Sequence, residues 1–178
     1  IGRERELEQT VAALGRARVV TLTGAGGVGK TRLGLQAAAQ VAPRFADGAW
    51  LAELAPVRDV AGVDAAVVAA FSLTARADQD TRKALAEFLR AKRLLLVLDN
   101  CEHLLEGAAA LTGTLARSCE RLVILATSRE GLGIEGEHLL PVPLWGCLRR
   151  APTWRRSRRR RRCACSPSAR PRSSPVSR

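Results

Sequence analysis

The chain has 178 residues, and 29 Lys and Arg against 17 Asp and Glu give it a formal net charge of +12 at pH 7. The last 33 residues, 146–178, contain 12 arginines and no acidic residue, so residues 1–145 are neutral. This neutral part is long enough to bury one hydrophobic core, and its charge does not indicate a nucleic-acid-binding protein. The chain has no run of 18 apolar residues, and its charged start, IGRERE, has no signal-peptide pattern. We therefore expect a cytoplasmic protein without membrane contact.

Short apolar runs alternate along residues 1–145 with segments of helical periodicity. We expect strands at residues 19–23, 48–54, 94–98, 122–126 and 139–142. We expect helices at residues 30–41, 59–73, 81–91 and 102–117, of which the second buries Val60, Val63, Val67 and Ala70 and the third is capped by Thr81. The runs LLLVL and LVILA are continuously apolar, as in strands buried on both faces. The predicted fold class is α/β, with a three-layer sheet of about five parallel strands and helices on both faces.

The segment GAGGVGKT, residues 24–31, matches the phosphate-loop pattern G-x-x-x-x-G-K-[ST] and lies between an expected strand and an expected helix. Its glycines let backbone N–H groups wrap closely around phosphate oxygens at the positive end of the helix. We expect Lys30 to reach the β- and γ-phosphates of a nucleotide and the Thr31 hydroxyl to ligate Mg²⁺. The predicted nucleotide contacts in this segment are Gly24, Ala25, Gly26, Gly27, Val28, Gly29, Lys30, Thr31 and Arg32.

A second Mg²⁺ ligand is expected at the end of the apolar strand 94–98, where Asp99 stands. The next residue, Asn100, can orient a water molecule but cannot accept its proton at neutral pH. Hydrolysis is therefore expected to be weak unless Glu102 serves as the base. Glu102 also fits a second interpretation, in which it is a first-turn acidic residue that stabilises the N-terminus of its own helix.

Polar residues follow the expected strand 122–126, and the last of them is Arg129. The carboxyl ends of parallel strands are where an α/β sheet presents groups to a ligand, so Arg129 is a candidate contact for the γ-phosphate. A surface arginine in a loop is the alternative. The remaining sequence disfavours two classes, guanine-specific GTPases and zinc-binding modules. Asn100 is the sole asparagine, so the guanine-reading motif Asn-Lys-x-Asp is absent, and the five cysteines and two histidines lack the spacing of a zinc site.

Four segments in this order carry a resemblance to a known family: residues 2–7 (GREREL), 20–33 (VTLTGAGGVGKTRL), 98–105 (LDNCEHLL) and 126–130 (ATSRE). They resemble the NB-ARC-type ATPase domain of STAND-class signalling proteins, in the branch found in actinobacterial SARP-like and LuxR-like transcriptional regulators. The resemblance covers residues 1–145. It implies a P-loop NTPase fold in which the strand before Arg129 lies between the phosphate-loop strand and the Asp99 strand. It also implies a switch that holds ADP when off and ATP when on.

By position, the resemblance implies that Gly2 and Arg3 lie near the adenine base. It implies that Lys30 and Thr31 are the Walker A residues, Asp99 the Walker B acid and Arg129 the sensor arginine. The cofactors expected are ATP or ADP and Mg²⁺. A conventional P-loop ATPase or kinase is the alternative function. In the family, helical and winged-helix subdomains follow; in this chain an Arg-, Ser- and Pro-rich segment begins instead after Trp145.

Residues 146–178 have three interpretations: an out-of-frame or truncated end, a disordered basic tail, and a tail that binds nucleic acid. The chain begins at Ile1 and contains no Met, so we expect it to be a piece of a longer reading frame. Contact with DNA is then expected only through further domains. Oligomerisation is an expectation for such a full-length protein rather than for this segment.

Overall fold

The structure is a computed structural model that describes residues 2–73 and 80–144. Its strands are β1 (Val19–Thr23), β2 (Ala49–Glu53), β3 (Leu95–Asp99), β4 (Val123–Ser128) and β5 (Glu137–Pro141). They form one sheet in the order β2-β3-β4-β1-β5, and every neighbouring pair is parallel. All five predicted strands are present within a few residues of the expected bounds. β4 lies between β1 and β3, as the resemblance implies.

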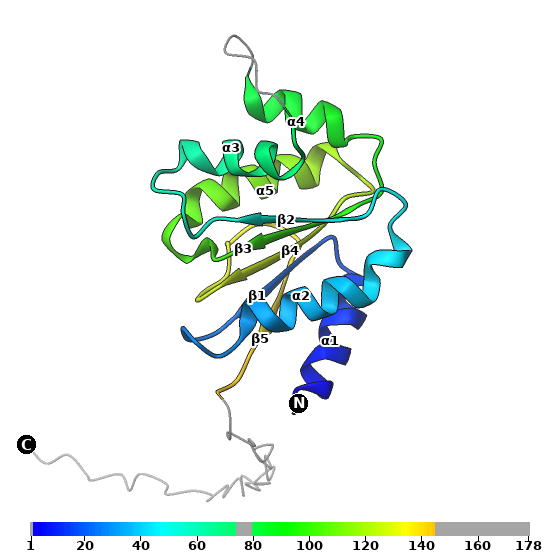
Figure 1. The fold of residues 1–178 in the computed structure, drawn as a ribbon, viewed down its shortest axis with the longest axis vertical. Helices are drawn as coiled ribbons and strands as arrows, with labels where there is room; N and C mark the ends of the chain where they lie inside the picture. Colours follow the sequence, from blue (N-terminus) through cyan, green and yellow to red (C-terminus); the bar gives the residue numbers. More distant parts are fainter. Residues whose placement is uncertain (1, 74–79, 145–178) are drawn as a thin grey trace, which may run out of the picture. The chain divides into compact units, whose positions relative to one another are not determined.

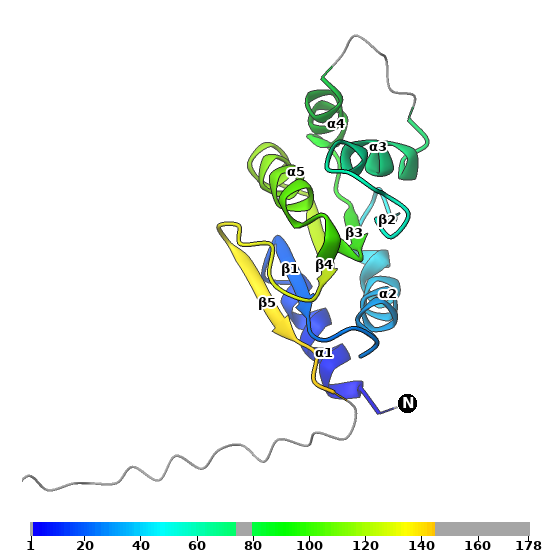
Figure 2. The same ribbon diagram turned by 90° about the vertical axis from the view of Figure 1, so that its left-hand side faces the viewer.

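The helices of the described residues are α1 (Glu4–Leu14), α2 (Lys30–Val41), α3 (Ala61–Ala70), α4 (Thr81–Leu89) and α5 (Leu105–Ser118), with short 3-10 turns η1 (Ala42–Arg44) and η2 (Cys101–His103). Helices α3, α4 and α5 cover one face of the sheet, and α1 and α2 cover the other (Figures 1 and 2). This three-layer parallel arrangement is the P-loop NTPase fold. No described helix has the length and apolar character needed to cross a bilayer.

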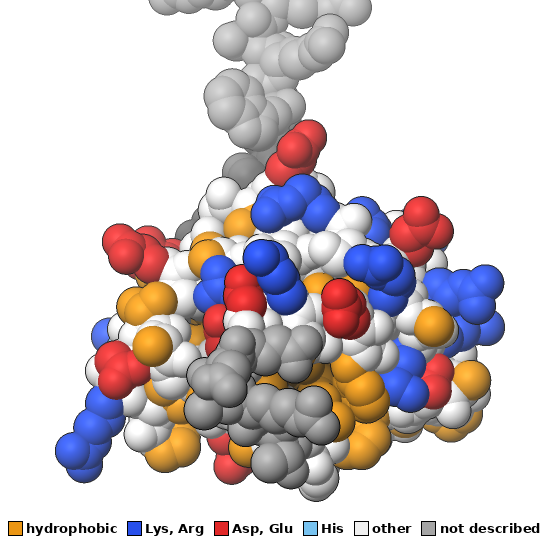
Figure 3. Space-filling view, turned by 90° about the horizontal axis from the view of Figure 1, so that it is seen from above, with side chains coloured by type: hydrophobic (Ala, Val, Ile, Leu, Met, Phe, Trp, Pro, Cys, Tyr) orange, Lys and Arg blue, Asp and Glu red, His pale blue; other side chains and the backbone are white. Residues whose placement is uncertain are grey.

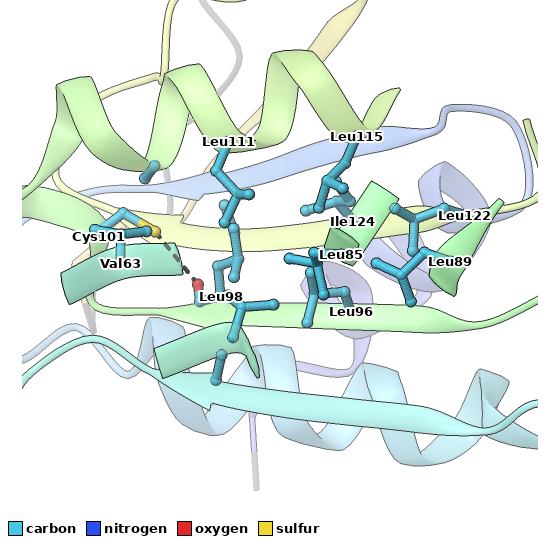
Figure 4. Close-up of a cluster of buried hydrophobic side chains, with 14 of the residues drawn as sticks. Val63, Leu85, Leu89, Leu96, Leu98, Cys101, Leu111, Leu115, Leu122 and Ile124 are labelled. Atoms are coloured by element: carbon cyan, nitrogen blue, oxygen red, sulfur yellow. Dashed lines mark hydrogen bonds between the residues drawn. The ribbon is translucent and has the colours of Figure 1, made fainter. Parts of the chain in front are cut away.

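Each face of the sheet has its own hydrophobic core, because the side chains of a strand alternate between its two faces. On the side of α3, α4 and α5, Leu96 and Leu98 of β3 pack among leucines of the helices (Figure 4). On the side of α1 and α2, Leu95 and Val97 of the same strand are buried. On the face of the molecule that Figure 3 shows, Lys and Arg side chains lie interspersed with Asp and Glu side chains.

Helix α1 was not among the predicted elements. It buries Leu7, Thr10, Ala13 and Leu14, a narrow stripe behind a charged first turn. Helix α1 packs on α2. Burial of this stripe therefore stabilises the helix more than the intrinsic helix propensity of its residues does.

Three details of the predicted helices were wrong. The cap of α4 is Asp80 rather than Thr81: its carboxylate accepts hydrogen bonds from the backbone N–H groups of Arg82 and Lys83. Helix α3 buries Val63, Val67 and Val68, whereas Val60 precedes the helix and is 46% exposed.

The expected helix at residues 102–117 is two elements. Asn100 adopts a left-handed conformation (φ 63°), the 3-10 turn η2 follows, and α5 begins only at Leu105. Asparagine tolerates this conformation better than most residues, and the turn redirects the chain before the helix starts.

The described residues lie in one compact unit, Ile1–Cys147. The second unit, Leu148–Arg178, is outside the described residues. The predictions for residues 146–178 therefore also lie outside them.

Candidate functional site

The phosphate-loop segment connects the end of β1 to the start of α2, as its sequence context predicts. At two positions of this segment the structure shows why the residue is glycine. At Gly24 (φ 149°), an added Cβ would lie 2.7 Å from the carbonyl oxygen of Val142, in the segment that follows β5. Gly29 (φ 89°) is the N-cap of α2 and has the left-handed backbone conformation that glycine adopts without strain. The backbone can therefore turn tightly in front of the helix N-terminus.

Lys30 is the first residue of α2, and its side chain folds back over the loop. Its ammonium Nζ donates hydrogen bonds to the carbonyl oxygens of Gly24 (2.9 Å) and Ala25 (3.1 Å). Val28 lies in the same loop, but its side chain is buried in the core beneath it. Val28 can thus offer only its backbone to a ligand, whereas Lys30 places a positive charge inside the loop.

Asp99 lies at the end of β3 and accepts two short hydrogen bonds on one carboxylate oxygen, Oδ1. The Thr31 hydroxyl donates at 2.7 Å and the Thr127 hydroxyl at 2.6 Å. Thr127 in turn accepts the backbone N–H of Asn100 at 2.9 Å. Carboxylate and hydroxyl oxygens are hard ligands of the kind that Mg²⁺ prefers, and Mg²⁺ is usually held by one or two carboxylates together with phosphate oxygens. The residues present therefore fit this ion.

Glu102 projects from η2 toward the same loop. Its Oε1 accepts a 2.9 Å hydrogen bond from Nε of Arg129, and its Oε2 lies 3.9 Å from Nζ of Lys30. The Arg129 guanidinium also lies against the phosphate loop, because a Cβ added at Gly26 would be 3.5 Å from its Nη2. One carboxylate thus bridges the two cations that the sequence predicts as phosphate contacts.

A cleft of about 520 Å³ joins these groups, and its lining includes Gly26, Gly29, Lys30, Thr31, Asn100 and Glu102. Asn100 lies at its border, and its side-chain Nδ2 is 3.5 Å from Nδ1 of His103. The Nε2 of His103 is 2.9 Å from the carbonyl oxygen of Val57, so Nε2 is the donor and Nδ1 the acceptor. His103 therefore orients Asn100 rather than forming part of a metal cluster.

Arg3 and Arg32 line a smaller hollow of about 70 Å³ together with Gly29, between α1 and α2. Arg3 Nη2 donates a 2.9 Å hydrogen bond to the carbonyl oxygen of Pro143. The structure thus places Arg3 beside the end of the phosphate loop and links it to Pro143, at the other end of the domain sequence. Gly2 does not line this hollow; its backbone N–H donates to the Glu4 carboxylate.

Thr127 was missed as a site residue. The sequence signal for Thr127 is its position directly after the apolar run of β4. Because β4 is the neighbour of β3 in the sheet, a residue at the end of β4 lies beside Asp99. The Cys101 thiol was also unassigned. It is buried behind the site and donates to the carbonyl oxygen of Leu98 (Figure 4). Burial, and next the charge of Asp99, raise the pKa of Cys101 to about 12, so this thiol stays protonated at neutral pH.

Comparison with known proteins finds relatives for most of the chain. A family model described as an AAA domain matches residues 13–149. An uncharacterized protein of Mycobacterium tuberculosis is 43% identical over 143 residues, which are 80% of this chain and 36% of that protein. Another protein of this organism, provisionally named an HTH-type transcriptional regulator, is 45% identical over 132 residues, 74% of this chain and 15% of that protein. The chain spans about a third or less of the length of these relatives.

Solved structures share the fold at low sequence identity. Cdc6p from Pyrobaculum aerophilum superposes with a TM-score of 0.62 at 18% identity, over 79% of this chain and 45% of that chain. A STAND protein with a tetratricopeptide repeat sensor from Pyrococcus horikoshii has a TM-score of 0.54 at 18% identity, over 80% of this chain and 23% of that one. Since the family match spans β1, the phosphate loop, β3 and β4, the chain belongs to the AAA domain family of P-loop ATPases.

Proposed function

We propose that residues 1–145 are the ATP- and ADP-binding switch domain, of the NB-ARC type, of a STAND-class transcriptional regulator. The observation that carries the proposal is a connected group of side chains at one cleft. Lys30, Thr31 and Glu102 line the cleft, Asp99 is hydrogen-bonded to Thr31, and Arg129 is paired with Glu102. Such an arrangement can bind a phosphate chain, hold Mg²⁺ and sense the terminal phosphate.

Each residue has a proposed role. The loop N–H groups of residues 24–29 and Lys30 bind the phosphates. Thr31 and Asp99 hold Mg²⁺, which when bound neutralises phosphate charge. Arg129 contacts the γ-phosphate, and Arg3 and Arg32 lie toward the nucleoside.

The residues near the expected position of the attacking water molecule favour slow hydrolysis. Asn100 follows Asp99 directly, and an amide cannot accept a proton from water at neutral pH. Glu102 is the carboxylate available as a base, but its oxygens are engaged by Arg129 and Lys30. Such a site suits a switch that changes state slowly better than a conventional ATPase or kinase.

The assignment to a regulator is supported by two likenesses. The relative provisionally named an HTH-type transcriptional regulator is much longer than this chain, so in that protein the matched segment is one part among others. The STAND protein shares the fold and bears a sensor. We propose that contact with DNA belongs to other parts of such a protein.

The test is to measure bound nucleotide and steady-state turnover of the purified chain with Mg²⁺, with Lys30→Ala as the control. We expect ATP and ADP to bind and turnover to stay below about one per minute, far under the rates of ordinary enzymes. Faster turnover would instead support a conventional ATPase. If deletion of residues 146–178 left nucleotide binding intact but removed nucleic-acid binding, it would support the alternative of a functional tail.

A further inference from the structure

The Glu102 carboxylate is placed where an anionic ligand of Lys30 and Arg129 would be held. Its side chain is 20% exposed, and that of Lys30 is 9% exposed, so the pair lies inside the cleft rather than on the open surface. Arg129 is 66% exposed, yet its Nε donates to Oε1 at 2.9 Å. This distance is that of a charge-assisted hydrogen bond, and a phosphate oxygen would accept from the guanidinium in the same way.

The backbone fixes both partners beside the phosphate loop. The carbonyl oxygen of Arg129 accepts the backbone N–H of Gly24 at 3.3 Å, at the start of the loop. The guanidinium lies over Gly26, as its distance of 3.5 Å from an added Cβ shows. The Arg129 guanidinium and the Glu102 carboxylate bound to it therefore both lie beside the loop, and a phosphate bound there would meet both groups.

A structural role at a helix terminus does not account for Glu102. It lies in η2, a turn of three residues, whereas α5 begins at Leu105 and has Glu106 in its first turn. Glu106 is exposed and makes none of the described contacts with the phosphate loop. The two residues share charge, size and neighbourhood in the sequence, but only Glu102 faces the cations.

We propose that Glu102 determines the preference of the site for nucleoside diphosphate over triphosphate. The carboxylate holds Arg129 and Lys30 in the absence of a terminal phosphate. A γ-phosphate must take over these cations, and it is repelled by the negative carboxylate that it displaces. A nucleoside diphosphate lacks the γ-phosphate, so it competes less with the Glu102 carboxylate for these cations. The inference rests on the proposed function, because it assumes that Arg129 contacts the γ-phosphate.

Replacement of Glu102 by the γ-phosphate, as the partner of Arg129 and Lys30, also gives the switch a physical basis. When the γ-phosphate takes the two cations, Glu102 loses its partners and η2 is released on that side. The neighbouring residue His103 connects η2 to Val57, in the segment that leads into α3.

The test compares Glu102→Gln with the matched control Glu106→Gln in the full chain. Dissociation constants for ADP and for a non-hydrolysable ATP analogue are measured by calorimetry with Mg²⁺. We expect Glu102→Gln to shift the ratio of the two constants about tenfold toward the triphosphate, the usual size of a coupling between two sites. Glu106→Gln should leave the ratio unchanged. In an Arg129→Ala background, the shift should fall below about threefold, because one of the two contested cations is gone.

The outcomes separate this inference from the function on which it rests. If the unmodified chain binds neither nucleotide, the proposed function is wrong and the inference falls with it. If the chain binds both but Glu102→Gln changes the two affinities equally or not at all, only the inference is overturned. A loss of turnover at an unchanged ratio would likewise overturn it, and would leave Glu102 as a base alone.

Discussion

The hydroxyl of Thr31 donates a 2.7 Å hydrogen bond to the carboxylate of Asp99, across 68 positions of sequence. Thr31 belongs to the first turn of α2, and Asp99 ends β3, two strands away from β1 in the sheet. The bond therefore forms only once the sheet has its native order. It brings together the two oxygen ligands that we assign to Mg²⁺ and leaves them beside the phosphate loop.

Replacing Asp99 by Asn should reduce the contribution of Mg²⁺ to ATP affinity at least about tenfold, because the amide keeps the shape but loses the charge that attracts the ion. Calorimetric titration of ATP with Mg²⁺ and with a chelator measures this contribution. The control is Glu53→Gln, since Glu53 pairs with Asp99 in the register of β2 and β3 and is exposed at the same edge. Equal effects of the two changes would argue against a Mg²⁺ ligand at Asp99.

Lys30→Ala should weaken ATP and ADP binding about a hundredfold or more, since it removes the buried cation that we propose binds the phosphates. The fold should persist, because the hydrogen bonds of Lys30 in the structure are to loop carbonyls. Titration gives the affinities, and circular dichroism checks the fold. Lys83→Ala is the control, as Lys83 is 81% exposed on α4. Retained binding in Lys30→Ala would refute the phosphate role.

Arg129→Ala should weaken ATP about tenfold more than ADP, since only ATP carries the γ-phosphate that Arg129 is proposed to contact. The matched control is Arg121→Ala, because this exposed arginine precedes the same strand β4 at its opposite end. Competition titrations with both nucleotides measure the ratio. Equal losses for ATP and ADP would remove the sensor role.

The strands and the loop were predictable because their signals are local. Continuous apolar runs at β3 and β4, and glycines between a strand and a helix, need no tertiary information. The place of β4 beside β1 came from the family resemblance and was confirmed. The contact of Thr127 with Asp99 depends on that order, so residue types alone could not reveal it. The left-handed Asn100 also has no periodic signal, so the residue pattern does not separate η2 from the helix that follows it.

The thiols of Cys101 and Cys119 should resist alkylation at pH 8 in the folded chain and react rapidly in denaturant. Both are buried, and burial raises both pKa values, that of Cys101 to about 12. At pH 8 about one Cys101 thiol in ten thousand is then ionised. Peptide mapping after iodoacetamide treatment measures the reaction at each residue, and fast labelling of Cys101 in the folded state would contradict this placement.

The raised pKa of Cys101 also sets the sign of a stability effect. Because the folded state holds the proton more tightly, its contribution to folding is complete below the unfolded pKa of about 8.5 and is lost as pH rises toward about 12. The free energy of unfolding should fall over this alkaline range, and Cys101→Ala should reduce the fall. Denaturant titrations at several pH values measure it, and an equal fall in both proteins would exclude Cys101 as its source.

Two glycines of α5 should respond to alanine in opposite directions. At Gly107, an added Cβ would lie 3.0 Å from Cγ2 of Val63 and 3.2 Å from the carbonyl oxygen of Val60, in the packed contact with α3. At Gly113, the nearest atom is Nη1 of Arg117 at 3.3 Å, the far end of a flexible side chain. Gly107→Ala should therefore lower the free energy of unfolding by about 1–3 kcal/mol through overpacking. Gly113→Ala should raise it by up to about 1 kcal/mol through helix propensity.

Urea titration of the two variants measures this difference within one helix. The difference between the two variants in free energy of unfolding cancels the common effect of replacing glycine by alanine. The sign of this difference therefore reports the packing of α5 against α3. That packing matters for the site, because η2 lies between β3 and α5 and presents Glu102 to Lys30 and Arg129. If Gly107→Ala stabilised the chain as much as Gly113→Ala, the close contact between the helices would be wrong.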